Sequence, residues 1–105
     1  MLLFKKKFLA MIASGAKRQT VRVWPRRRLR PGQVEFVPGL GRIRVTAFEP
    51  VRPADLTEED AAIDGFASRA ALIEELRALY GDRLESIPCF RIRFTYPLEG
   101  ASSGG

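Results

Sequence analysis

Alternation of apolar and polar side chains restricts the folds open to this sequence. Over residues 90–96, phenylalanine, isoleucine and tyrosine alternate with arginine and threonine. A period of two places successive side chains on opposite faces of a β-strand. Further alternating runs predict three more strands, over residues 19–24, 34–36 and 43–51. A helical bundle is therefore excluded, and the glycine-containing link before residue 43 predicts an antiparallel hairpin.

Helical signals separate these strands. Apolar residues at helical spacing, capping residues and terminal glycines predict three helices, over residues 5–14, 57–65 and 68–81. Thr57, followed by Asp60 at the third helical position, and Ser68 are the expected N-terminal caps. The element order is helix, three strands, two helices, strand. It predicts an α+β fold, a small antiparallel barrel or curled sheet with helices on its side and mouth.

The chain length fits one domain. Of the 105 residues, we assign 1–96 to the domain and 97–105, rich in glycine and serine, to a flexible tail. No apolar run approaches the roughly 20 residues that span a membrane. At the N-terminus the apolar residues precede the lysines, which is the reverse of a secretory signal. We therefore expect a cytoplasmic protein that does not contact a membrane.

The cysteine and histidine counts exclude several kinds of active site. The sequence has one cysteine, Cys89, and no histidine. It can form no intrachain disulfide, and catalysis by Ser-His-Asp or Cys-His groups is excluded. Any acid–base chemistry would use Lys, Tyr, Asp or Glu. We expect no metal site and no cofactor, and we expect Cys89 to be a small core residue.

Charge is divided unevenly along the chain. The net charge of +6 combines +11 over residues 1–52 with −5 over residues 53–105. A basic half suggests a polyanionic partner, of which single-stranded RNA is the one we expect. Solvation of an arginine-rich surface is the alternative. The arginines expected to contact phosphates are Arg26, Arg27, Arg28, Arg30, Arg42 and Arg44.

Three polar side chains can converge where the first predicted helix is followed by the first predicted strand. The chain turns at Gly15, and Thr20 and Arg22 then point to the same face of a strand, with Lys17 at its entry. A lysine near other cations has a lowered pKa and can act as a base. A threonine hydroxyl needs such a neighbour to become a nucleophile. The alternative is a basic strand edge whose side chains are solvated.

Several motifs together resemble the ASCH (activating-signal-cointegrator homology) domain family. They are Phe4-Lys5-Lys6-Lys7-Phe8, Gly15-x-Lys17-x-x-Thr20-x-Arg22, Arg30-Pro31-Gly32-Gln33, the helix start Leu56-Thr57-Glu58-Glu59-Asp60-Ala61 and the last strand. The resemblance covers about residues 1–96. It implies a small β-barrel similar to the PUA domain, an RNA-binding module. It also implies a cleft for RNA or a nucleoside at the barrel mouth.

The family includes small bacterial amidohydrolases that remove the acetyl group of N4-acetylcytidine. This resemblance implies that Lys17 activates the Thr20 hydroxyl, which attacks the acetyl carbonyl. Asp64 stands where the family has a glutamate that handles the proton of the leaving amine. The aspartate is one methylene shorter, and a misplacement near 1 Å can cost on the order of 10²-fold in rate. The alternative role for Asp64 is a salt bridge to an arginine of the basic half.

Three functions remain open from the sequence. The first is binding of single-stranded RNA or a nucleoside, with Trp24 and Phe66 stacking on bases. Core or rim packing is the alternative role for both aromatic residues. The second is metal-free amide hydrolysis, and the third is protein interaction in transcription or translation. For the first two we expect Lys17 and Thr20 side by side and surface-accessible at the barrel mouth.

Overall fold

The computed structural model describes residues 1–97, so residues 98–105 of the expected tail lie outside the described residues. The helices are α1 (Lys6–Ser14), α2 (Glu58–Ile63), α3 (Arg69–Tyr80) and α4 (Arg83–Ser86), with a short 3-10 helix at Pro53–Asp55. The strands are β1 (Gln19–Val23), β2 (Val34–Val37), β3 (Gly41–Pro50) and β4 (Cys89–Thr95). No helix in this part of the chain is long and apolar enough to cross a lipid bilayer.

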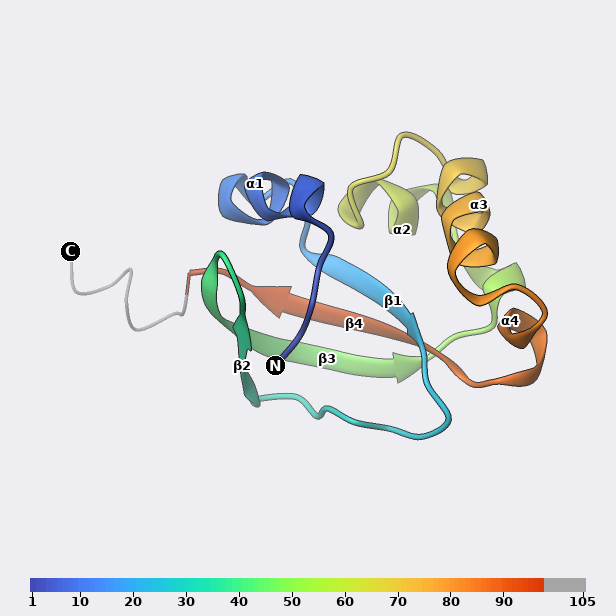
Figure 1. Cartoon of the computed structure of the whole chain (residues 1–105), viewed down its shortest axis with the longest axis horizontal. Coiled ribbons are helices and arrows are strands. Elements are labelled where there is room, and N and C mark those ends of the chain that lie inside the picture. Colours follow the sequence, from blue (N-terminus) through green and yellow to red (C-terminus); the bar gives the residue numbers. More distant parts are fainter. Residues whose placement is uncertain (98–105) are drawn as a thin grey trace.

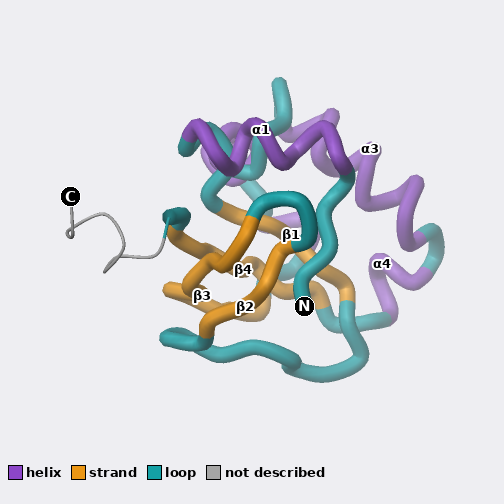
Figure 2. The backbone as a smooth tube through the Cα atoms, turned by 60° about the vertical axis from the view of Figure 1, so that its left-hand side comes forward, coloured by secondary structure: helices purple, strands orange, loops and turns teal. Residues whose placement is uncertain are grey.

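The four strands form one antiparallel sheet in the order β1-β4-β3-β2. Strand β4, the last strand within residues 1–97, therefore lies inside the sheet, and β1 is an edge strand. The sheet curls into a half-barrel (Figures 1 and 2), and its register shifts between Val45 and Ala47. The N-terminal segment lies alongside β2, where the Leu2 amide donates to the Phe36 carbonyl (2.9 Å). The predicted α+β fold, with a curled antiparallel sheet and helices packed on it, is confirmed.

Each face of the sheet has its own hydrophobic core. Inside the curl, Ile12 of α1 packs with Ile43, Val45 and Ile92. On the other face, a second cluster joins β1 to α2, α3 and α4, and contains Val21, Val23, Ala61, Leu72, Leu76 and Leu84. In Figure 1, α1 and the α2–α3 pair lie on the same side of β1 and leave its edge between them. This arrangement positions the candidate site.

Local sequence accounts for most helix boundaries. Gly15 ends α1 in the left-handed region with a φ of 86°, where a residue without Cβ is favoured. Thr57 and Asp60 form a reciprocal capping box at the start of α2, and the Ser68 hydroxyl accepts from the Ala71 amide at the start of α3. These predicted caps are confirmed. The four-residue helix α4 was not predicted, because it is too short to show a helical period.

Candidate functional site

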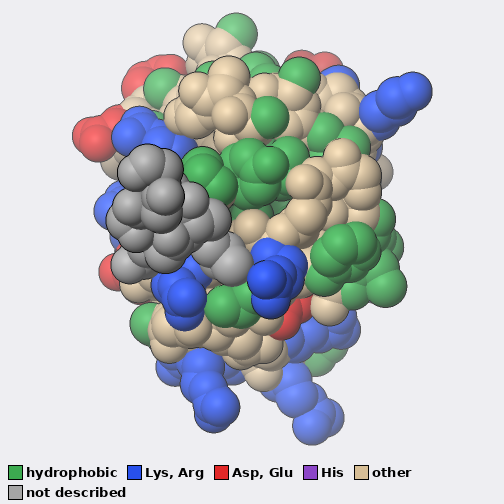
Figure 3. All heavy atoms as spheres, turned by 90° about the vertical axis from the view of Figure 1, so that its left-hand side faces the viewer, with side chains coloured by type: hydrophobic (Ala, Val, Ile, Leu, Met, Phe, Trp, Pro, Cys, Tyr) green, Lys and Arg blue, Asp and Glu red, His purple; other side chains and the backbone are tan. Residues whose placement is uncertain are grey.

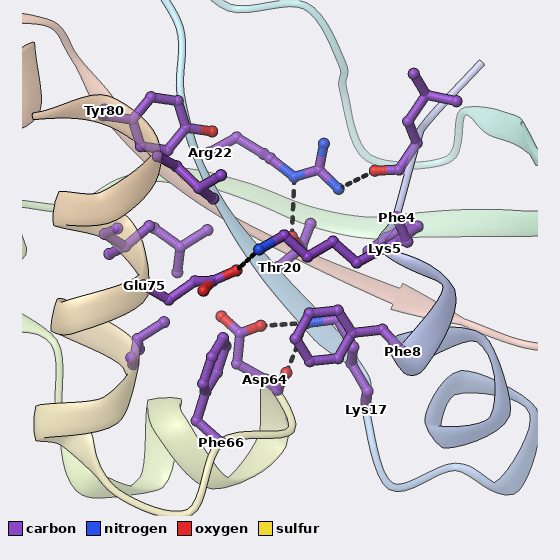
Figure 4. A pocket seen from close by; sticks show the side chains of 15 residues that line it. Phe4, Lys5, Phe8, Lys17, Thr20, Arg22, Asp64, Phe66, Glu75 and Tyr80 are labelled. Carbon is purple, nitrogen blue, oxygen red and sulfur yellow. Dashed lines mark hydrogen bonds and ion pairs between the residues drawn. The ribbon is translucent and has the colours of Figure 1, made fainter.

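A pocket of about 410 Å³ opens over the free edge of β1. One wall comes from the N-terminal segment and α1, and the opposite wall comes from α3 (Figure 4). The floor is formed by Lys17, Thr20, Val21 and Arg22, and the turn after α2 contributes Asp64 and Phe66. The volume lies in the range of small-molecule sites.

Lys17 and Asp64 form a buried ion pair at the base of this pocket. Both residues are 2% exposed. The Lys17 ammonium donates to the Asp64 carboxylate and to the Asp64 backbone carbonyl. The backbone holds the two segments together, since the Arg18 amide donates to the Ile63 carbonyl (2.8 Å). Gly65 permits this approach, because its φ is 92° and a Cβ there would lie 3.2 Å from Met11 Sδ.

Three aromatic rings surround the Lys17 ammonium. It lies 4.4 Å from the centroid of Phe8, 5.7 Å from that of Phe4 and 5.8 Å from that of Phe66. The negative faces of such rings attract a desolvated cation. The pocket is therefore apolar on its walls, with a charged pair at its base.

The ion pair leaves one oxygen without a partner. Asp64 Oδ2 is buried and accepts no hydrogen bond from any residue in the range 1–97. Burial raises the pKa of Asp64 and lowers that of Lys17, while the attraction between the two charges opposes both shifts. A buried acceptor without a donor costs free energy, so a ligand N–H or O–H at this point would be favoured.

Thr20 is held by Arg22. The Arg22 Nε donates to Thr20 Oγ1 (3.0 Å), and its Nη2 donates to the Leu3 carbonyl (2.6 Å). The guanidinium also lies over the Phe4 ring, 4.8 Å from the centroid. Because the Thr20 oxygen accepts this bond, its own proton stays available to another acceptor.

The backbone of Val21 adds a donor and an acceptor. The Phe94 amide donates to the Arg18 carbonyl, and the Trp24 amide donates to the Pro88 carbonyl. Hydrogen-bonded pairs alternate along an antiparallel ladder, so Thr20 and Arg22 also pair with β4. The N–H and C=O of Val21 therefore point away from β4, toward the free edge that lines the pocket.

The structure brings five of the predicted site residues around the pocket: Lys17, Thr20, Arg22, Asp64 and Phe66. The expectation that Lys17 and Thr20 are surface-accessible is wrong, since they are 2% and 5% exposed. Among the described residues no hydrogen bond joins Lys17 to Thr20, because each has another partner. Asp64 forms its ion pair with a lysine rather than with an arginine.

The other predicted residues do not line the pocket. They are Trp24, Arg26, Arg27, Arg28, Arg30, Arg42 and Arg44. Trp24 stacks on Phe48 (6.2 Å between ring centroids) and is covered by the Arg28 guanidinium (5.0 Å). Arg27 lies over Phe48 in the same way (5.0 Å). Figure 3 shows one face of the molecule on which several Lys and Arg side chains lie in the lower half, with others near its upper edges.

Sequence reasoning missed several pocket residues, among them Phe4, Phe8, Glu75 and Tyr80. Phe4 and Phe8 are four residues apart on the apolar side of the N-terminal segment and α1, and this side also lines the site. The position of Glu75 could have been noticed in the sequence, because a charged residue stands there at the helical spacing of apolar residues. It is three residues after Leu72 and four before Leu79 on the apolar side of α3. Within residues 1–97, no three Asp, Glu or Cys side chains lie close enough together to hold a metal ion.

Comparison with solved structures identifies the fold. An ASCH domain from Lactobacillus crispatus JV V101 superposes with a TM-score of 0.71 at 18% identity, covering 83% of this chain and 68% of that one. The chain has the fold of an ASCH domain. The chain is also similar to the hypothetical protein PH0355 (TM-score 0.76, 17% identity, 89% of this chain and 94% of that one covered). It is similar as well to PF0455 from Pyrococcus furiosus (TM-score 0.69, 23% identity, 92% and 94% covered). No family model and no curated protein match the sequence.

Proposed function

We propose that the pocket binds the base of a nucleoside, either free or within single-stranded RNA. The observation that carries this proposal is Asp64 Oδ2, a buried acceptor without a partner in a pocket of about 410 Å³. Nucleobases offer N–H donors for such an oxygen and a flat face for Phe66, which lines the pocket. The free N–H and C=O of Val21 supply further in-plane contacts.

The arginines outside the pocket support the RNA form of this ligand. Arg27 and Arg28 lie over aromatic rings, and Arg27 Nε donates to the Leu29 carbonyl (2.9 Å). The other N–H groups of the two guanidinium groups would serve as donors to phosphate oxygens. The base in the pocket would then provide specificity, and the phosphate contacts on this surface would position the strand. A cytoplasmic location, which we propose from the sequence, would give access to RNA and nucleosides.

Titration with adenosine, cytidine, guanosine and uridine, followed by the NMR signals of the pocket amides, tests this proposal. We expect saturable shifts with at least one of them. The Asp64→Asn variant should bind that nucleoside about 10- to 100-fold more weakly, because a hydrogen bond to a charged group is lost. The Asp55→Asn variant, altered at an exposed carboxylate, is the matched control and should bind normally. No saturable shift with any of the four would overturn the proposal.

The same residues support amide hydrolysis of an acylated cytidine as a second candidate. Burial shifts the pKa values of Lys17 and Asp64 toward a neutral amine and a protonated carboxyl. The amine would take the Thr20 proton as Oγ1 attacks the acyl carbon, and Arg22 would stabilise the oxyanion of the nucleophile. The C–N bond then breaks as Asp64 protonates the amine, and water hydrolyses the acyl-threonine to acetate.

Incubation with N4-acetylcytidine, with chromatography for cytidine and acetate, tests hydrolysis. Thr20→Val should abolish turnover, while Thr46→Val, at an exposed strand position, should leave it unchanged. Asp64→Glu should raise turnover, because the longer carboxylate reaches further toward the leaving amine. Turnover that survives Thr20→Val excludes the threonine nucleophile. Failure of both the parent and Asp64→Glu to release acetate excludes hydrolysis and leaves the binding proposal standing.

A further inference from the structure

A second ion pair spans the mouth of the pocket. The Lys5 ammonium, just before α1, donates to Glu75 Oε2 of α3 (2.6 Å), and Figure 4 shows this contact reaching across from the N-terminal segment to the helix. The side chains of Lys5 and Glu75 are 51% and 19% exposed, against 2% and 3% for Lys17 and Asp64. The pocket therefore has a buried ion pair at its bottom and a partly exposed ion pair at its mouth.

Stability does not account for a carboxylate at this position. A partly exposed ion pair contributes about 0–1 kcal/mol. Glu75 lies on the apolar side of α3, whose neighbours Leu72 and Leu76 are buried in the core. Its second oxygen, Oε1, has no hydrogen-bond partner within the described chain. Glu75 thus holds an unused acceptor at the entrance to the pocket.

The depth of the pocket orients a nucleoside. This step rests on the proposed function, in which Asp64 and the aromatic rings hold the base at the bottom. The sugar attached to that base then lies at the mouth, beside Glu75. An ionised carboxylate can only accept hydrogen bonds, so its partner must be a donor. The donors that a nucleoside carries outside its base are the hydroxyls of the sugar.

We propose that Glu75 accepts a hydrogen bond from the ribose 2′-hydroxyl, and that Lys5 fixes the carboxylate for this contact. The 2′-hydroxyl is the group by which proteins distinguish RNA from DNA. The pocket would then select ribonucleosides over 2′-deoxynucleosides through a residue at its mouth, independently of how it recognises the base.

Affinities for the four ribonucleosides and their 2′-deoxy counterparts test this assignment. For the base that binds, the parent should prefer the ribose form on the order of 10-fold, as expected for one hydrogen bond to a charged group. Glu75→Gln should lose most of this preference by weakening the ribonucleoside alone. Glu74→Gln, at the exposed neighbouring position on α3, is the matched control and should keep the preference.

The possible failures are distinct. Equal affinity of the parent for the ribose and deoxyribose forms overturns the Glu75 contact and leaves nucleoside binding intact. A preference that persists in both Glu75→Gln and Glu75→Ala, each confirmed as folded by circular dichroism, also overturns it. Absence of binding by all eight nucleosides overturns both the proposed function and this assignment.

Discussion

Lys17 and Asp64 place two charges where apolar side chains would cost less free energy. Each residue is 2% exposed. Burial lowers the pKa of Lys17 and raises the pKa of Asp64, because it disfavours the charged form of each. Replacing a buried ion pair by apolar residues of similar volume is often neutral or stabilising, whereas removing one partner is strongly destabilising. A contribution to folding therefore does not account for the pair, which is consistent with the proposed role of Asp64 in ligand binding.

This argument predicts a non-additive pair of substitutions. Lys17→Met and Asp64→Leu should each lower the free energy of unfolding by about 3–5 kcal/mol, because each leaves one buried charge unpaired. The double variant should regain most of the loss while failing to bind nucleosides. Urea unfolding of the parent, both single variants and the double variant measures the coupling. Additive losses would show that the two charges do not depend on each other.

A second residue-scale prediction concerns Cys89. Burial raises the pKa of its thiol to about 11, so little thiolate is present near neutral pH. We expect a disulfide reagent to modify the native protein slowly at pH 8, and the protein unfolded in urea rapidly. Fast modification of the native protein would contradict the buried placement of this side chain in the second core.

Accessibility at the site could not be predicted from the sequence. Alternation correctly put Thr20 and Arg22 on one face of β1, because that relation is local. The elements that close the pocket over the β1 edge come from other parts of the chain: the segment with Phe4 and Phe8, and helix α3. No local sequence pattern predicts that these elements meet over Lys17. Their meeting turned an expected surface lysine into a buried one.

At the scale of elements, Asp60 ties helix α2 to the sheet. It accepts from the Thr57 amide (2.9 Å) as part of the cap, from Gln19 of β1 (3.2 Å) and from Arg91 of β4 (3.2 Å). Asp64 ends the same helix, so this tie also fixes the position of the pocket carboxylate. The Asp60 cap therefore positions both helix α2 and the Asp64 carboxylate at the end of that helix.

The tie predicts a pH dependence of stability. Burial alone would raise the pKa of Asp60, but the hydrogen bonds from Thr57 and Gln19 and the charge of Arg91 outweigh it and lower the pKa. Its stabilisation is thus fully present above the unfolded value of about 3.9 and is lost as the pH falls through the lower folded value. Asp60→Asn should cost about 1–2 kcal/mol at pH 7 and flatten the acid limb of the unfolding curve. Urea unfolding from pH 7 to pH 2.5 measures this, with Asp55→Asn as the control. An unchanged acid limb in Asp60→Asn would contradict the tie.

The elements themselves were predictable to the extent that their signals were local. Gly15, Thr57 and Ser68 each mark a helix boundary within one turn, and the loop Gly39-Leu40-Gly41 joins two strands that pair directly. The strand order was not predictable, because β1 and β4 pair across some 70 residues of sequence. Helix α4 exists because Leu84 is buried in the second core, which is a tertiary cause.

At the scale of the whole molecule, the pocket and the surface that carries Arg27 and Arg28 are separate. Arg27 and Arg28 belong to the long connection from β1 to β2, which runs along the side of the sheet opposite α1 and α3 in Figure 1. The pocket is closed by those two helical segments. Single-stranded RNA that used both features would have one base in the pocket and its backbone across the connection. Substitutions in the pocket and in the β1–β2 connection should therefore affect base binding and phosphate binding separately.

The final prediction uses this separation. Replacing Arg26, Arg27 and Arg28 with alanine should weaken single-stranded RNA binding and reduce the slope of log affinity against log salt by about 2, since each lost phosphate contact on a single strand contributes roughly 0.7. Binding of a single nucleoside should not change, because none of the three lines the pocket. The control replaces Arg52, Arg77 and Arg83, exposed arginines that belong to or precede the helical half, and removes the same charge. If the control lowers the slope equally, the arginine connection acts only through net charge. If neither triple variant changes the slope, these arginines serve to solvate the sheet, and the pocket alone would account for any nucleoside binding.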